Sequence, residues 1–144
     1  MTETPLFTPQ TEWLPPIIFP DLRDRKEIAI DLETKDPFLK THGSGSVVGR
    51  GCVTGFAVAI EGWAGYYPIA HEGGGNMDKK TVLKWIKEVL LTDADKIFHN
   101  AMYDVCWLRA MGFKINGRII DTMIATSLID ENRGRYDLNS VCKD

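Results

Sequence analysis

The pattern of apolar residues changes once along this chain, and this change constrains the fold more than any other feature. Residues 27–33, 52–60 and 63–69 form three short apolar runs that are typical of β-strands. Glu61-Gly62 separates the last two runs, which favours a β-hairpin. The first half of the chain is therefore predicted to form a meander of three strands.

Beyond residue 78 the pattern alternates between helices and short strands. Helices are expected over 78–91, 101–111, 121–129 and 137–144, and strands over 96–99 and 119–120. A meander followed by alternation predicts an α/β fold in which helices flank a mixed β-sheet. Because the last helix is so short, we expect the fold to be incomplete at its C-terminus.

Composition excludes several classes of protein. The chain has 144 residues, 44% of them hydrophobic, which suits one buried core. Its 17 Lys and Arg against 20 Asp and Glu give a net charge of −3, which argues against a protein that coats nucleic acid electrostatically. Three cysteines without paired spacing argue against a disulfide framework or a structural zinc site. With no signal peptide and no apolar run near about 18 residues, we expect a cytoplasmic protein without membrane contact.

The first 25 residues hold five of the seven prolines and cannot form a regular helix. We expect an extended arm that lies over the domain, with four apolar docking residues: Trp13, Ile17, Ile18 and Phe19. A disordered leader is the alternative. The folded domain is expected to begin at Glu27.

Two carboxylates end the first predicted strand. Asp31 and Glu33 lie two residues apart, so both side chains point to one face of the strand, opposite an apolar face. Neighbouring carboxylates repel each other unless a cation lies between them, and Mg²⁺ prefers oxygen ligands. This pattern indicates a divalent metal site, although a solvated strand end would also explain it.

A second polar cluster follows the strand at 96–99. Asn100 is expected to be the N-cap of the next helix, and Asp104 lies one turn into that helix. Both side chains are expected to face the end of the sheet. Helix capping and the helix dipole explain each residue separately, but they do not explain why both acidic clusters follow short apolar strands.

These residues resemble the proofreading 3′–5′ exonuclease domain of family A DNA polymerases, in the DEDD nuclease superfamily. The resemblance rests on three motifs in order and one later segment: Asp31-Leu32-Glu33-Thr34, His99-Asn100-Ala101-Met102-Tyr103-Asp104, Ile120-Asp121-Thr122-Met123 and residues 134–141. It covers the chain from Glu27 onward, which divides the sequence into an arm (1–25) and a partial exonuclease domain (26–144).

The resemblance implies a ribonuclease H-like fold and two-metal hydrolysis of DNA 3′ ends with Mg²⁺ or Mn²⁺. Asp31, Glu33 and Asp104 would be the catalytic metal ligands, with Asp31 bridging both ions. Thr34 and Asn100 would hold the terminal nucleotide of single-stranded DNA, and Phe38 or Leu39 would be an apolar wedge against its base. Asp121 is interpreted as a helix cap or a residue behind the ligands.

One family motif is absent. The family pairs a Tyr with an Asp four residues later, but here Tyr136 is followed by Ser140. We therefore expect the isolated chain to bind at most one cation well and to cleave poorly. We also expect it to self-associate or to need the polymerase part that carries the missing motif. Because no 5′-nuclease-like segment precedes the exonuclease motifs, the resemblance favours a phage polymerase over a cellular one.

Two other functions remain open. The chain could be a non-catalytic module that keeps the fold and binds single-stranded DNA or a protein. It could also be a related nuclease that acts on RNA ends. The Gly-rich segment 42–51 lacks a phosphate-loop signature and is expected to be a mobile loop.

Overall fold

The computed structural model describes residues 13–143. Five strands form one sheet in the order β3-β2-β1-β4-β5. Their bounds are β1 Glu27–Lys35, β2 Cys52–Ile60, β3 Trp63–Pro68, β4 Asp95–Phe98 and β5 Ile119–Asp121. The β1, β2 and β3 strands pair antiparallel, whereas β4 pairs parallel with both β1 and β5. The mixed sheet predicted from the sequence is confirmed.

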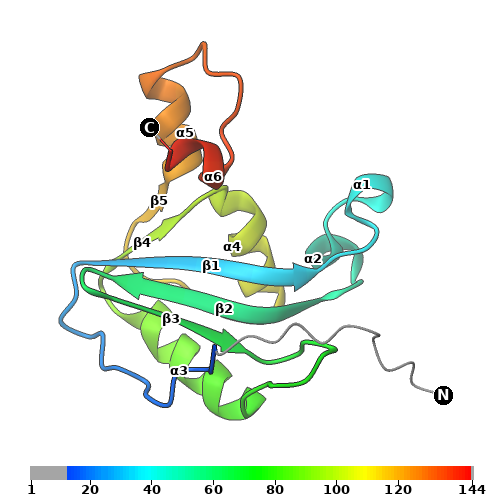
Figure 1. Ribbon diagram of the computed structural model, residues 1–144, viewed down its shortest axis with the longest axis vertical. Helices are drawn as coiled ribbons and strands as arrows, with labels where there is room; N and C mark the ends of the chain where they lie inside the picture. The colour runs from blue at the N-terminus through cyan, green and yellow to red at the C-terminus, as the bar shows by residue number, and fades with distance from the viewer. Residues whose placement is uncertain (1–12, 144) are drawn as a thin grey trace.

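Helices lie in the connections from β1 to β2, from β3 to β4 and from β4 to β5, and after β5 (Figure 1). Their bounds are α1 Leu39–His42, α2 Gly45–Val48, α3 Lys79–Leu91, α4 Ala101–Ala110, α5 Thr122–Ile129 and α6 Leu138–Val141. The final helix begins after Asp137, as predicted, but ends at Val141. None of the helices in residues 13–143 is long and apolar enough to cross a membrane.

The core lies between one face of the sheet and the helices α3 and α4. On β1 the buried residues are Ile28, Ile30 and Leu32, the apolar face that the sequence predicted. They share one core cluster with Ile86 of α3 and Leu108 of α4. Because Asp31 and Glu33 alternate with these residues, they lie on the opposite face, which α3 and α4 do not cover.

The part of the N-terminal arm that the structure describes packs along the sheet and α3. The ring of Phe19 stacks on Tyr67, with 5.3 Å between ring centroids, and meets Trp85 edge-on. The hydroxyl of Tyr67 donates to the carbonyl of Ile18, and the indole of Trp85 donates to the carbonyl of Pro20. Docking through Phe19 agrees with the sequence prediction.

Two expectations for the arm are wrong. The side chains of Ile17 and Ile18 are 94% and 61% exposed, so only the backbone of Ile18 is used. Leu22 is 3% exposed and belongs to the core, so the folded domain begins before Glu27. Trp13 lies beside Tyr66, with 5.8 Å between ring centroids. Residues 1–12, where the rest of the arm was predicted, lie outside the described residues.

The segment 42–51 is not the loop that its Gly and Ser content predicted. It contains the end of α1 and the whole of α2. The carboxylate of Asp36 accepts hydrogen bonds from the backbone N–H of Gly45 at 3.0 and 3.2 Å. A Cβ at Gly45 would lie 2.0 Å from the carbonyl oxygen of Arg50, so only glycine allows this turn to close. Tertiary anchoring, rather than local propensity, holds these short helices.

Candidate metal site on strand β1

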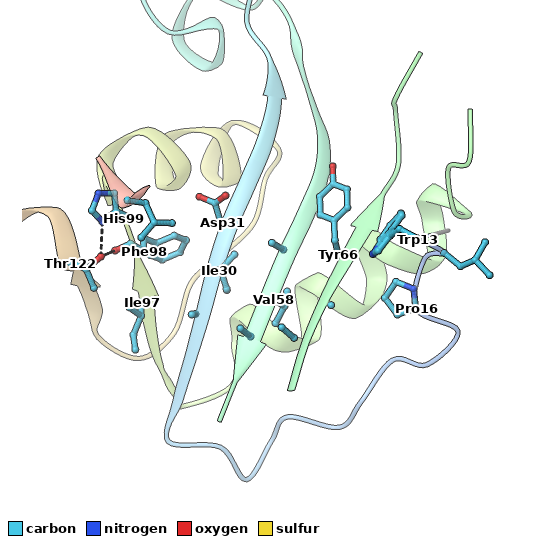
Figure 2. Close-up of a pocket in the computed structure, with 17 residues that line it drawn as sticks. Trp13, Pro16, Ile30, Asp31, Val58, Tyr66, Ile97, Phe98, His99 and Thr122 are labelled. Carbon is cyan, nitrogen blue, oxygen red and sulfur yellow. Dashed lines mark hydrogen bonds between the residues drawn. The ribbon is translucent and has the colours of Figure 1, made fainter. Parts of the chain in front are cut away.

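Asp31 and Glu33 lie on the open face of the sheet, next to small residues on β2. The prediction that they end the strand is wrong, because β1 continues to Lys35. In the β1–β2 pair Asp31 is opposite Ala57, and Glu33 is opposite Gly55. Asp31 is one of the residues that line an open groove of about 690 Å³, and Figure 2 shows its carboxylate there. The neighbouring strand therefore leaves both carboxylates accessible to a ligand.

Asp104 approaches this site from α4. Its side chain is 3% exposed, and its Oδ2 atom has no hydrogen-bond partner among the described residues. Burial, together with the charges of Asp31, Asp121 and Glu33, raises the pKa of Asp104 to about 7. Asp104 is thus a buried carboxylate whose ionisation is opposed by three others.

The pKa of Asp31 is also raised, first by burial and then by Glu33, while His99 acts in the opposite direction. Carboxylates that raise one another's pKa would be stabilised by a cation. Within residues 13–143, no three His, Cys, Asp or Glu side chains are grouped closely enough to hold a metal ion alone. Mg²⁺ usually takes one or two protein carboxylates, with water and substrate phosphate as its other ligands. The donors present fit such a partial site.

Asp121 caps two helices at once. One of its oxygens accepts from the N–H groups of Asn100, Met123 and Ile124, and the other accepts from Ala101 at 2.8 Å. Partial burial favours a higher pKa, but these four N–H donors outweigh it and hold the pKa of Asp121 below its usual range. The predicted capping role of Asp121 is confirmed.

Asn100 occupies the N-cap position of α4, as predicted, but it does not cap the helix through its side chain. Asn100 adopts a left-handed conformation (φ 68°), and its side chain makes no capping hydrogen bond. Asp121, from the adjacent strand, caps α4 in its place. Asn100 is exposed whereas Asp104 is buried, so the two side chains have different surroundings.

The two other predicted substrate-binding residues, Thr34 and Phe38, have different surroundings. Thr34 follows Glu33 but points to the other side of β1, where its hydroxyl hydrogen-bonds the hydroxyl of Tyr103 at 2.9 Å. The ring of Phe38 is 42% exposed beside α1, and the guanidinium of Arg50 lies 5.2 Å from its centroid. Leu39, the other wedge candidate, is equally exposed.

The sequence reading missed Tyr66 and His71. The hydroxyl of Tyr66 hydrogen-bonds Nε2 of His71 at 2.5 Å. A Cβ at Gly55 would lie 2.1 Å from that hydroxyl, so the phenol lies across Gly55, the partner of Glu33. Burial raises the pKa of Tyr66, and the charge of Glu33 raises it further. No local motif links β3 to β1, because their proximity depends on the sheet register.

His99, at the end of β4, holds the C-terminal segment. Its Nδ1 hydrogen-bonds the hydroxyl of Thr122, as Figure 2 shows, and its Nε2 donates to the carbonyl of Tyr136 at 2.6 Å. His99 therefore connects β4 to α5 and to the turn before α6. This agrees with the packing role predicted for it.

The structure thus combines an open mixed sheet, a carboxylate pair on its central strand and a third carboxylate on the helix after the neighbouring strand, the features that the family resemblance predicted. Residues 7–144 match the 3′–5′ exonuclease family of the DNA polymerase A type. The chain belongs to this family. The match begins within the proline-rich arm, earlier than the resemblance drawn from the motifs.

Relatives and solved structures agree with this assignment. The chain is 34% identical to a DNA-directed DNA polymerase of Pseudomonas phage M6 over 151 residues, which cover 98% of this chain and 22% of the polymerase. It is also 34% identical to DNA polymerase DpoZ of Acinetobacter phage SH-Ab 15497, over 61% of this chain and 14% of that protein. The chain therefore spans less than a quarter of either polymerase.

A solved structure with a similar fold is that of Brucella melitensis NrnC with bound Mg²⁺. Its TM-score is 0.57 at 23% identity, over 85% of this chain and 54% of NrnC. This likeness shows the fold.

Proposed function

We propose that this chain is the metal-dependent 3′–5′ exonuclease part of a phage DNA polymerase and removes nucleotides from single-stranded DNA 3′ ends. The observation that carries the proposal is the buried, unpartnered Oδ2 of Asp104 beside Asp31 and Glu33. A structural carboxylate in this position would need hydrogen-bond donors, whereas a metal ligand needs free oxygens.

In this proposal Asp31, Glu33 and Asp104 hold the cations, Mg²⁺ or Mn²⁺. When bound, the cations supply a water-derived nucleophile and stabilise the leaving oxygen. The protein keeps Asp31 accessible at the open groove and Asp104 buried, so the ligands meet the substrate from two elements. Phe38, which is exposed, stacks on the terminal base in this proposal, and Asn100 holds the terminal nucleotide. The hydroxyl of Thr34 faces Tyr103, which leaves only the backbone of Thr34 to contact the nucleotide.

The isolated chain should hold one cation better than two and cleave slowly. This follows from the lack of a three-carboxylate group in the described residues and from the absence of the Tyr and Asp pair that the family resemblance requires. The missing groups would come from the polymerase part or from a second copy. The protein would then act in the cytoplasm of a phage-infected bacterium.

The test is degradation of 5′-labelled single-stranded DNA with Mg²⁺ or Mn²⁺ by the wild-type chain and by Asp31→Ala. Glu61→Ala is the matched control, because Glu61 is an exposed acid at the turn between β2 and β3. Metal-dependent shortening that only Asp31→Ala abolishes supports the proposal. Binding without shortening in either metal would favour the non-catalytic module, and faster shortening of RNA would favour the ribonuclease alternative.

A further inference from the structure

Three side chains connect the two elements that carry the acidic residues. The hydroxyl of Tyr103 donates to Oδ2 of Asp36 at 3.0 Å and lies 2.9 Å from the hydroxyl of Thr34. Tyr103 immediately precedes Asp104 on α4, and Thr34 immediately follows Glu33 on β1. Each end of the contact is therefore adjacent in sequence to a proposed metal ligand.

The direction of each hydrogen bond follows from the number of protons. Tyr103 has one hydroxyl hydrogen, which it donates to the carboxylate of Asp36. Thr34 must then donate its own hydrogen to the oxygen of Tyr103. In this chain of hydrogen bonds, Thr34 donates to Tyr103 and Tyr103 donates to Asp36, so the hydrogen atoms of both hydroxyls are used.

Asp36 extends this chain to a third element. Its carboxylate also accepts from the N–H of Gly45, at the start of α2. The three side chains are half-buried, so these hydrogen bonds are only partly exposed to competing water. The network therefore joins the end of β1, the first turn of α4 and the start of α2.

The β1–β4 pairing alone leaves this end of the site weakly fixed. It pairs Glu27, Ile28 and Ala29 with the residues of β4, and it does not reach Asp31 or Glu33. Within the described residues, Asp104 makes no hydrogen bond from Oδ2 that could set its own position. The distance between the strand carboxylates and Asp104 thus depends on contacts such as the Thr34–Tyr103 hydrogen bond.

We propose that Tyr103 is a positioning residue: with Thr34 and Asp36 it fixes the spacing between the β1 carboxylates and Asp104, and so sets the affinity for a divalent cation. The inference rests on the proposed function in assigning these carboxylates to a metal. It assigns Thr34 a positioning role through its hydroxyl, on the side of β1 away from Asp31.

The test compares variants of the full chain that leave its net charge unchanged. Each is titrated with Mn²⁺, and binding is measured by electron paramagnetic resonance. Tyr103→Phe and Thr34→Val should each weaken Mn²⁺ binding about two- to tenfold, the range expected for losing one or two hydrogen bonds. The double variant should be little worse than either single one, because both remove the same contact. Thr34→Ser keeps the hydroxyl and should bind like the wild type.

Tyr136→Phe is the matched control, since its hydroxyl donates at 2.9 Å to the carbonyl of Asp130, away from this network. Unchanged Mn²⁺ affinity in Tyr103→Phe, or additive losses in the double variant, would overturn the inference. If the wild-type chain bound no Mn²⁺, the proposed function would fail, and hydrogen exchange of residues 33–36 and 101–106 would decide on the contact alone. Faster exchange in Tyr103→Phe would support it, and equal exchange would exclude it.

Discussion

Lys96 on β4 and Asp104 in the first turn of α4 are both buried charged residues, and their surroundings are opposite. The ammonium of Lys96 donates to the carbonyls of Thr92, Ala94 and Asn116 at 2.7–2.9 Å. Asp104 has an oxygen without a partner and three carboxylates as electrostatic neighbours. Burial alone therefore does not distinguish the two residues; the presence or absence of compensating partners does.

Replacing Lys96 should give the largest change in stability. Lys96→Met removes three charge-assisted hydrogen bonds and leaves three carbonyls without their donor, so we expect a loss of about 3–5 kcal/mol. Urea unfolding measures it, with the exposed Lys87→Met as the control. A loss as small as that of the control would mean that the carbonyls find water instead.

Removing the charge of Asp104 should change the free energy of unfolding in the opposite direction. Asp104→Asn removes a buried charge that its neighbours repel, and in metal-free buffer at pH 8 it should raise the free energy of unfolding by about 1 kcal/mol. The same variant should lose at least about 100-fold in Mg²⁺-dependent cleavage, as expected when a metal site is damaged. Destabilisation by Asp104→Asn would show that the acid is structural.

The pH dependence of stability should also show the unfavourable charge of Asp104. The folded pKa of Asp104, about 7, lies above its unfolded value, so the folded chain binds more protons between about pH 4 and pH 7. Its contribution to stability is therefore present at low pH and is lost as the pH rises through about 7. We expect the wild-type chain to lose on the order of 2 kcal/mol relative to Asp104→Asn over this range.

Added Mg²⁺ provides the control for this pH effect. A cation binds the ionised carboxylates, so it should raise the melting temperature of the wild-type chain at pH 8 and have little effect on Asp104→Asn. Thermal scans from pH 5 to pH 8, with EDTA or with Mg²⁺, measure both effects. A wild-type profile parallel to that of the variant would contradict the raised pKa.

The smallest effect is expected at a glycine on the open face. A Cβ at Gly55 would meet only the end of the Tyr66 side chain, which can move, so Gly55→Ala should cost less than about 1 kcal/mol. At Gly117 (φ 78°) a Cβ would lie 2.1 Å from the carbonyl oxygen of Ala94, an acceptor for Lys96. Gly117→Ala should therefore cost more in the same urea titration; equal costs would mean that Tyr66 is fixed.

Local sequence patterns predicted the elements of the sheet and the face on which Asp31 and Glu33 lie. They failed where distant segments decide the outcome. Asp121 replaces Asn100 as the cap of α4 because β5 lies beside β4. Leu22 belongs to the same core cluster as Trp85 and Val89 of α3, which are more than 60 residues away in the sequence.

The same reasoning explains why the positioning network was missed. Tyr103 and Asp36 are 67 residues apart, and neither position shows a pattern that predicts the contact. Tyr66 reaches the neighbourhood of Glu33 only because the β2–β3 register places it opposite Ala57. Motif spacing located the candidate ligands, whereas the groups that hold them depend on the assembled sheet.

The mixed sheet also has a consequence for the order of folding. The antiparallel strands join residues close in sequence, such as Ile60 and Trp63, whereas the parallel pair joins Glu27 to Asp95. Closing the longer loop costs more chain entropy, so we expect the meander to form before β4 and β5 add to it. Asp31 and Glu33 belong to the early half and Asp104 to the late half. The nuclease site would thus be assembled only in the last step, when the newly made chain completes its fold.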